Sequence, residues 1–494
     1  MNVDKKKTMQ VETEYKRLKK IIENAISNGN YEKALAGISV ASYLMYEWNQ
    51  KATDDYLETA ISSVAIITRQ SKLRMVYPQE DVVMFYDGFG LDTRGLAYIY
   101  LRALVNHREK LVYVVPKAAK NKQQEIDKIF VGKNVRIIYY STQKHYCKLL
   151  ELQKIYMEVR PAKAFIYTTP CDSSGVALFM QMENVIRYQI NLTDHAFWLG
   201  THAFDYCLEY RNYGASISYY HRNIAKEKLI MIPIYPVIDL NKRFDGFPFE
   251  TLGKKILFSG GSLYKTIDSD NTYFYMVDQI LHRNEDLIFV YAGGGYSGEL
   301  NRLMKKYPRR AYHIHERSDL YQAMVASTLY LNTYPLPGGL MTQYAAVAGK
   351  IPITLRYDVS GEGYLLDQEN RGCIYDSKED LIEDVTKLLK NSEYLRQREE
   401  KIKGSVIKQI EFDTQIDKIL NSQASQFRIE YKAYNIDTFK RGFIERFDYN
   451  EFLISIANRS NSSLACEYMN AYVRKLVVRG CKKIVQVTHT KFFS

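Results

Sequence analysis

The sequence lacks the residue patterns that mark metal sites, disulfide frameworks and membrane spans. Its 494 residues include only six cysteines and two tryptophans, and no two cysteines form a C-x-x-C pair. This spacing disfavours zinc sites and disulfide frameworks. No stretch approaches the roughly 18 apolar residues that a bilayer span needs, and the amino terminus has no apolar signal-peptide core. We therefore expect a reduced, cytoplasmic protein without a metal ion.

Dense basic clusters are also absent, although the formal net charge is +12. Beyond Lys5, Lys6 and Lys7, no dense run of basic residues with interleaved aromatics occurs, and the basic residues are spread along the chain. This distribution predicts a solvated cationic surface and no nucleic-acid partner. The chain likewise contains no G-x-S-x-G elbow, Walker A loop or H-E-x-x-H motif, which disfavours the common hydrolases and NTPases.

What is present is a helical start followed by two α/β patterns. Residues 1–76 show apolar spacing of three and four, which predicts helices. A stretch at residues 30–46 resembles one tetratricopeptide helix, but no copies follow at a fixed period, and a repeat array needs about three units. We therefore expect a helical amino-terminal region.

Short apolar segments then alternate with helical ones, restart once, and predict two parallel sheets. The expected strands of the first domain are residues 81–86, 111–115, 135–140 and 164–168, with a further strand and loop in 185–199. Those of the second are 255–259, 287–291, 311–314, 328–332 and 351–354. The fold class is α/β, with two Rossmann-like doubly wound domains at 77–245 and 246–423 facing a cleft. Residues 424–494 form a mixed helical extension. Ligands of such sheets bind beyond the carboxyl ends of the strands.

A Pro-Gly-Gly segment follows one expected strand of the second domain. Gly338 and Gly339 precede a helix that begins with Leu340, Met341 and Thr342. Glycines let the backbone approach an anion, and unpaired N–H groups at a helix start bind it with a favourable dipole. This segment predicts a diphosphate site, with the Thr342 hydroxyl as a further donor.

A second strand of this domain opens into Gly260, Gly261 and, four residues on, Lys265. A lysine cation at this position would offset the charge that develops on a departing nucleoside diphosphate. An ordinary solvated loop lysine is the alternative. A G-x-G-x-x-G at residues 293–298 is interpreted as a glycine turn near the phosphates rather than an NAD site, because its strand is not the first of its domain.

Two histidine-containing segments complete the candidates. His315 and Arg317 follow a strand end and are expected to meet a nucleobase edge. His313 and His315 would share one strand face as metal ligands, but no third ligand is evident, and either of these two histidines is equally compatible with a structural role. In the first domain, His195 stands beside Asp194 and is a candidate general base.

Four of these segments together resemble the catalytic region of the O-GlcNAc transferase family, the family 41 glycosyltransferases, which include bacterial protein glycosyltransferases. They are FSGGSLYKTIDSD, LNTYPLPGGLMTQYAAVAGKIPI, HIHERSDLYQAM and RYQINLTDHAFWLGTHAFDYCLEYR, within roughly residues 80–360. The resemblance implies a GT-B fold and metal-independent, inverting transfer from a UDP-linked sugar, such as UDP-GlcNAc, to a protein or glycan acceptor. No cofactor is implied. Lys265 would be the lysine that contacts the donor phosphates.

The sequence departs from that family at several positions. The family's His-Thr-Thr is replaced by Gly339, Leu340 and Met341, which leaves mainly backbone donors. The histidine after the first strand is absent, and Asp92 stands there as a second candidate base. A non-catalytic subunit that assists a partner transferase and a nucleotide-sugar epimerase are therefore the alternatives. Association with a membrane surface or a partner subunit is left open.

Overall fold

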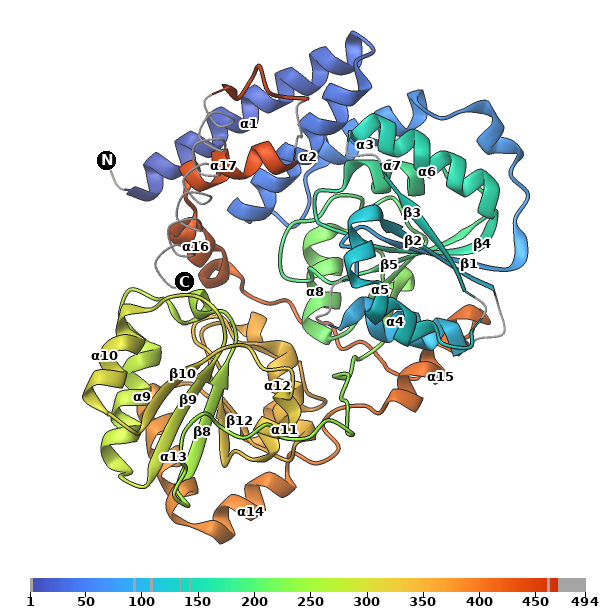
Figure 1. The fold of residues 1–494 in the computed structure, drawn as a ribbon. Helices are drawn as coiled ribbons and strands as arrows, with labels where there is room; N and C mark the ends of the chain where they lie inside the picture. The colour runs from blue at the N-terminus through green and yellow to red at the C-terminus, as the bar shows by residue number, and fades with distance from the viewer. Residues whose placement is uncertain are drawn as a thin grey trace, which may run out of the picture. The chain divides into compact units, whose positions relative to one another are not determined.

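The computed structural model describes residues 3–91, 95–106, 110–133, 135–141, 144–459 and 463–469. The described residues form two compact units (Figure 1). The first contains the chain up to Ile232 and returns at Gln415, and the second runs from Pro233 to Thr414. Each unit is an α/β layer structure, so the predicted fold class is confirmed.

The first unit holds a seven-stranded sheet and the second a six-stranded sheet. The strands are β1 (Gln79–Asp87), β2 (Lys110–Pro116), β3 (Val135–Tyr140), β4 (Pro161–Tyr167), β5 (Ile186–Ile190), β6 (Tyr206–Glu209) and β7 (Leu229–Met231), then β8 (Lys255–Gly260), β9 (Leu287–Ala292), β10 (Ala311–Ile314), β11 (Leu329–Leu331), β12 (Pro352–Leu355) and β13 (Ile374–Tyr375). The sequence predicts ten of these segments as strands, and the short strands β6, β7 and β13 were missed.

Helices flank both sheets. In the first unit they are α1 (Val3–Ser27), α2 (Tyr31–Trp48), α3 (Asp55–Ile67), α4 (Leu96–Asn106), α5 (Gln123–Phe130), α6 (His145–Val159), α7 (Ser173–Gln181), α8 (Asn212–Arg222), α16 (Asp437–Arg446) and α17 (Tyr449–Arg459). In the second they are α9 (Thr272–Arg283), α10 (Gly298–Lys306), α11 (Leu320–Val325), α12 (Gly339–Val347), α13 (Lys378–Lys390) and α14 (Ser392–Glu400), and α15 (Gln409–Leu420) leads back to the first unit.

All strand pairs in both sheets are parallel, and their order reverses once in each. The first sheet runs β3-β2-β1-β4-β5-β6-β7 and the second β10-β9-β8-β11-β12-β13. In each unit the chain therefore runs from a central strand to one edge of the sheet, returns to the centre, and then runs to the other edge. The reversal lies between β1 and β4 in one sheet and between β8 and β11 in the other. Crevices at such switch points are where open α/β sheets bind ligands.

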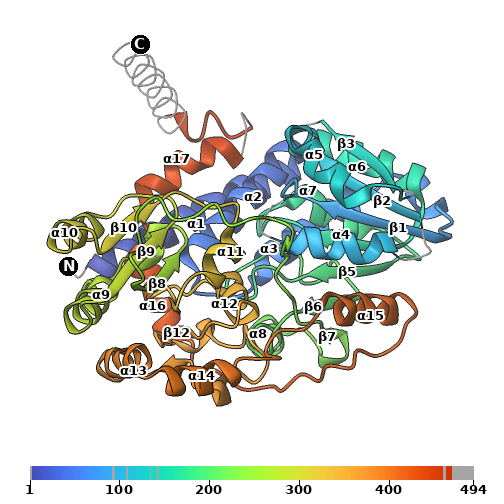
Figure 2. The same cartoon turned by 60° about the horizontal axis from the view of Figure 1, so that its bottom comes forward.

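Burial on both faces explains why the strands are continuous apolar runs. Helices α4 and α5 cover one face of the first sheet and α6 and α7 the other; in the second unit α9, α10 and α13 lie opposite α11 and α12 (Figures 1 and 2). The segment LIFVYA of β9 is buried at every position. A sheet packed on two faces needs apolar side chains at successive residues, not at alternate ones.

The two ends of the described chain share one core in the first unit. Helices α16 and α17 lie alongside α1 and α2 in both views (Figures 1 and 2). Phe447 and Phe452 join the apolar cluster that contains α1–α3 and one face of the first sheet. The hydroxyl of Tyr449 donates to Glu14 at 2.9 Å. The carboxy-terminal helices are thus an integral layer of this unit.

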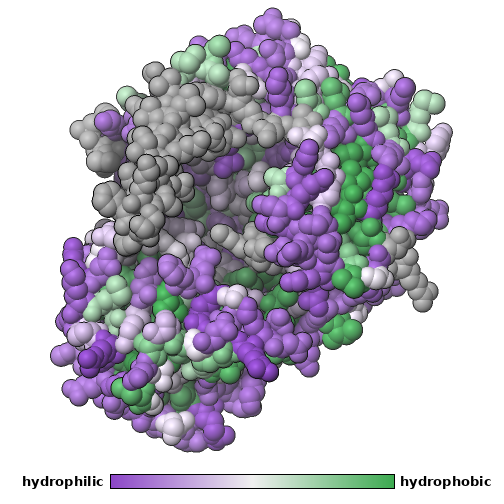
Figure 3. All heavy atoms as spheres, in the orientation of Figure 1, coloured by the Kyte–Doolittle hydropathy of each residue, from purple (hydrophilic) through white to green (hydrophobic). Residues whose placement is uncertain are grey.

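The visible surface is mainly hydrophilic, with smaller apolar areas between polar ones (Figure 3). Among the described residues, no helix combines the length and apolar character that a membrane crossing requires.

A buried carboxylate links a strand and two helices of the first unit, β1, α6 and α7. Asp172 caps α7 by accepting from Gly175 N at 3.0 Å. It also accepts from the Tyr86 hydroxyl at 2.5 Å and from Lys148 Nζ at 2.9 Å. Burial alone would raise the pKa of Asp172, but the Lys148 ammonium and the hydroxyl donors outweigh burial and lower it to about 2.

We expect Asp172→Asn to weaken folding most strongly near neutral pH. An unfolded aspartate titrates near about 4. The difference in the free energy of unfolding between wild type and Asp172→Asn should therefore be largest above that pH and shrink as the pH falls toward about 2. Urea unfolding across this range measures it. Asp81→Asn, which alters an exposed pair with Lys110, is the control and should change stability little. A difference between wild type and Asp172→Asn that does not depend on pH would contradict this account.

Candidate functional site

The switch point of the second unit brings two of the predicted segments together. The loop after β8 carries Lys265, and the loop after β11 leads into α12. Because β8 and β11 are neighbours in the sheet, their loops leave the same edge side by side. The N–H of Leu336 donates to the carbonyl of Lys265 at 3.3 Å, which joins the two loops directly. Segments seventy residues apart in sequence therefore form one surface.

Glycines allow the turns at this edge to pack backbone against backbone. Gly261 has φ +130° and Gly293 φ +156°, and a Cβ on Gly293 would lie 1.9 Å from the carbonyl oxygen of Gly261. A Cβ on Gly260 would meet Ala292 O at 2.8 Å and Met341 Cε at 3.2 Å. The glycine turn after β9 is therefore part of this edge, and it supports the loop that carries Lys265.

The buried side chain of Asn332 holds the turn at the start of α12 through two hydrogen bonds. Its Oδ1 accepts from Gly338 N at 2.8 Å, and its Nδ2 donates to Thr342 Oγ1 at 2.8 Å. The Thr342 hydroxyl in turn donates to Gly338 O at 3.0 Å. Thr342 is fully buried. Its hydroxyl, predicted as a donor to a diphosphate, here fixes the shape of the Pro-Gly-Gly turn.

This brace leaves the first-turn amides of α12 available. The helix has no side-chain cap. Within the described part of the chain, the N–H groups of Gly339, Leu340 and Met341 have no hydrogen-bond acceptor. Three unpaired donors at the positive end of a helix are suited to an anion. The ring of Tyr364 packs against Gly339, where a Cβ would lie 2.2 Å from a ring carbon.

Lys265 lies in a short 3-10 helix, Leu263–Thr266, directly after the Gly260–Gly261 turn. Its side chain is half-buried, and its Cδ lies 4.0 Å from the Cβ position of Gly261. The stem of the lysine thus follows the glycine turn. The structure places Gly260 against Met341 of the first turn of α12, and Lys265 against the loop that leads into that helix.

His315 and Arg317 lie beyond β10, at the outer end of this sheet. His315 is exposed. The Arg317 guanidinium donates to Asp319 through Nε at 2.7 Å and to the carbonyl of Gly246 at 2.8 Å. In this arrangement Arg317 anchors the segment that enters the second unit. Neither residue contacts the loops after β8 and β11 through a described hydrogen bond.

In the first unit, His195 follows the carboxyl end of β5. Its Nδ1 lies 3.2 Å from Asp194 Oδ1, and its side chain is 38% exposed. Asp194 also accepts from Arg211 Nε at 2.5 Å. Burial would raise the pKa of Asp194, but the Arg211 guanidinium outweighs burial and holds it well below its usual range. The carboxylate therefore orients the imidazole and leaves Nε2 facing away from it, the arrangement that a general base needs.

Asp92, the other candidate base, lies outside the described residues. Within the described part of the chain, no group of three or more His, Cys, Asp or Glu side chains is placed to hold a metal ion.

Three residues of these sites were not singled out by the sequence. Asn332 shapes the turn, Arg211 fixes Asp194, and Tyr364 packs on Gly339. Asn332 had a signal, since a polar amide at the end of an apolar strand must find partners when buried. Arg211 and Tyr364 had none, because their partners are 17 and 25 positions away in the chain.

Gly339→Ala should disrupt the start of α12 because the added methyl group would overlap the Tyr364 ring. We expect a loss of about 1–3 kcal/mol in the free energy of unfolding, measured by urea denaturation. Gly298→Ala is a matched control, because Gly298 is also the first residue of a helix and has open space around it. It should be neutral or slightly stabilising. Equal effects of the two changes would contradict the packing described for Tyr364.

Solved structures of other proteins share this fold. No family model matches the sequence, and no curated protein matches it. The structure is similar to a glycosyltransferase from Rickettsia africae, with 10% identity, 69% of this chain and 98% of that chain covered, and a TM-score of 0.51. It is similar to a putative UDP-N-acetylglucosamine 2-epimerase from Listeria monocytogenes, with 14% identity, 71% and 100% coverage, and a TM-score of 0.51.

A third similar structure is HepE of Anabaena in complex with UDP and glucose, with 12% identity, 69% of this chain and 99% of that chain covered, and a TM-score of 0.50. At such identities the likeness concerns the fold alone. The chain therefore has the GT-B type of architecture, two doubly wound α/β domains with additional helices at both ends of the first unit.

Proposed function

We propose that the protein is a glycosyltransferase whose second unit binds a nucleoside-diphosphate sugar, with UDP as the nucleotide. The observation that carries the proposal is the switch point between β8 and β11. There the Lys265 loop is hydrogen-bonded to the loop before α12, and three amides of the first turn of α12 have no acceptor within the described residues. A pyrophosphate is the ligand whose charge and size suit one cation and a helix start. The fold shared with proteins solved with UDP supports the choice of nucleotide.

The chemistry proposed is a direct displacement at the anomeric carbon. An acceptor oxygen forms a bond to that carbon while the bond to the β-phosphate oxygen breaks, and UDP leaves with the electron pair. His195 takes the acceptor proton at Nε2, and Asp194 stabilises the imidazolium. Lys265 and the amides of Gly339–Met341 stabilise the charge on the departing diphosphate. The acceptor is a protein or a glycan, and the step needs no metal ion or other cofactor.

Arg317 fits a role in fixing the protein chain better than one in reading a base, since its guanidinium is occupied by Asp319 and Gly246. The exposed His315 remains the proposed contact to the nucleobase. The family 41 assignment belongs to this proposal as well: the loop of Lys265 and the Pro-Gly-Gly turn support it, and the absence of the family's His-Thr-Thr weighs against it.

Lys265→Ala should weaken the binding of UDP. Loss of one charge-assisted contact to a phosphate is worth about 1.5–3 kcal/mol, or roughly a 10- to 100-fold rise in Kd. Isothermal titration calorimetry with UDP measures it. Lys305→Ala removes an exposed lysine from α10 and is the control for net charge. A wild-type protein that binds neither UDP nor UDP-GlcNAc would favour the non-catalytic subunit, and an unchanged Kd for Lys265→Ala would remove the phosphate site from this edge.

His195→Gln should separate chemistry from donor binding. We expect the release of UDP from UDP-GlcNAc to fall about 100-fold or more, because a general base is lost, while the Kd for UDP stays unchanged. Chromatographic detection of UDP and NMR of the sugar product distinguish transfer or hydrolysis from epimerisation. Formation of an altered UDP-sugar without acceptor would support the epimerase instead. A parallel loss of UDP affinity would show that His195 is not a base but part of the donor site.

A further inference from the structure

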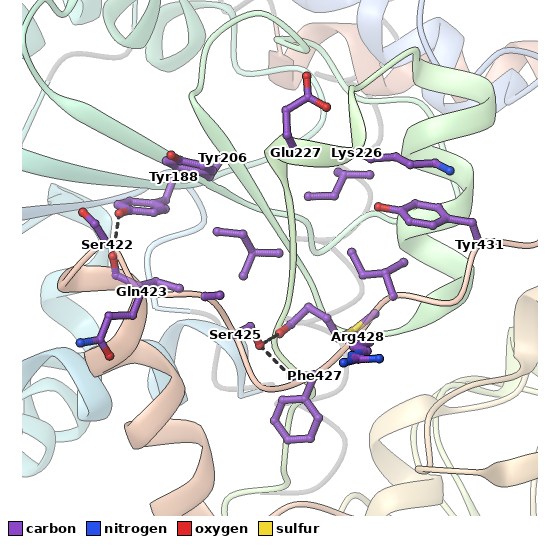
Figure 4. A pocket seen from close by; sticks show the side chains of 16 residues that line it. Tyr188, Tyr206, Lys226, Glu227, Ser422, Gln423, Ser425, Phe427, Arg428 and Tyr431 are labelled. Carbon is purple, nitrogen blue, oxygen red and sulfur yellow. Dashed lines mark hydrogen bonds between the residues drawn. The ribbon is translucent and has the colours of Figure 1, made fainter.

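The first unit contains a second candidate site, a pocket. Its lining includes none of the residues proposed for donor binding or as the general base. Its volume is about 770 Å³, and it lies between strands β5–β7 and the chain segment 419–431 (Figure 4). Two hydrogen bonds hold that segment against the sheet: Tyr188 donates to Ile419 O at 3.1 Å, and Ser425 Oγ donates to Met231 O at 2.7 Å. The pocket is thus built by the return of the chain to the first unit.

One wall of the pocket is the end of an aromatic column that crosses the sheet. Phe85 stacks on Phe165 with ring centroids 6.4 Å apart, Phe165 on Tyr188 at 4.8 Å, and Tyr188 on Tyr206 at 5.7 Å. The three interplanar angles lie between 16° and 22°. The first three rings are buried, whereas Tyr206 is 37% exposed. The column therefore presents a firmly supported aromatic ring at the pocket.

The opposite wall carries Tyr431 and Lys226, as Figure 4 shows. Lys226 Nζ lies 4.7 Å from the centre of the Tyr431 ring. Aliphatic side chains, including Leu229 and Ile429, also line the pocket. Two aromatic walls and an aliphatic lining form a slot for a flat, partly apolar ligand.

Polar side chains of both signs stand around this slot. The side chains of Glu227 and Arg428 line it, and within the described residues neither side chain forms a hydrogen bond or ion pair. The amide of Gln423 adds a group that both donates and accepts. Among the described lining residues, Lys226 and Arg428 come from separate segments and no α-helix begins, whereas clustered cations and an α-helix start are the features that select phosphate.

We propose that this pocket binds a neutral oligosaccharide. Sugar rings have an apolar C–H face that an aromatic ring covers, and a rim of hydroxyls that both donate and accept hydrogen bonds. The walls match the first property, and Glu227, Arg428 and Gln423 match the second. The volume lies within the range of small-ligand sites and accommodates a few sugar units. This site is separate from the proposed donor site and does not depend on the proposed sugar transfer.

The test is a titration of the full chain with cellotriose, maltotriose and chitotriose, followed by saturation-transfer NMR and calorimetry. At least one trisaccharide should bind with a dissociation constant in the millimolar range or below. Tyr206→Ala should weaken that binding about tenfold, which corresponds to about 1.4 kcal/mol. Tyr206→Phe keeps the ring and should retain it. Tyr220→Ala, an exposed tyrosine of α8 that does not line the pocket, is the matched control, and circular dichroism confirms that each variant is folded.

Failure of all three trisaccharides to bind would overturn the proposal, and so would binding that Tyr206→Ala leaves unchanged. Displacement of the sugar by an unglycosylated amphipathic peptide with higher affinity would identify a peptide groove instead. UDP is titrated in the same preparations. Sugar binding without UDP binding keeps this pocket and removes the proposed function, and the reverse result removes the pocket alone.

Discussion

The buried amide of Asn332 is the constraint on which the candidate donor site depends. It uses both of its polar atoms to hold the Pro-Gly-Gly turn, accepting from Gly338 and donating to Thr342. A turn held from inside does not need the next three amides for its own stability. Those amides are left at the positive end of α12, where an anion gains most from them. The site is thus a consequence of how the protein satisfies one buried side chain.

The strand order of the sheet that carries this turn is the second constraint on the candidate donor site. The order β10-β9-β8-β11-β12-β13 makes β8 and β11 neighbours although they are not consecutive in the chain. The glycines after β8 and β9 then allow the loops to approach within backbone contact, with Gly293 against Gly261. Any side chain at Gly293 would push these loops apart and move Lys265 away from the start of α12.

In the first unit, buried charge is used to orient groups rather than to bind ligand. Asp194 is fixed by Arg211 and faces Nδ1 of His195, and Asp172 is fixed by Lys148 and caps α7. Each carboxylate keeps a depressed pKa because its cation outweighs the cost of burial. The return of the chain after α15 adds a different feature to this unit, a pocket with an aromatic column on one side.

Local sequence patterns were enough to predict the α/β class, the position of most strands and the two loops proposed as a phosphate site. Continuous apolar runs such as LIFVYA and glycines at strand ends are local signals, and they survive without knowledge of the rest of the chain. The two-residue strand β13 is too short for such a signal. Tertiary contacts between residues separated in the chain set the other features: Arg317 is occupied by Gly246, Thr342 faces inward, and segment 419–431 closes a pocket in the first unit. These contacts join residues that are not neighbours in the chain. Such contacts leave no repeating pattern in the sequence from which they could be predicted.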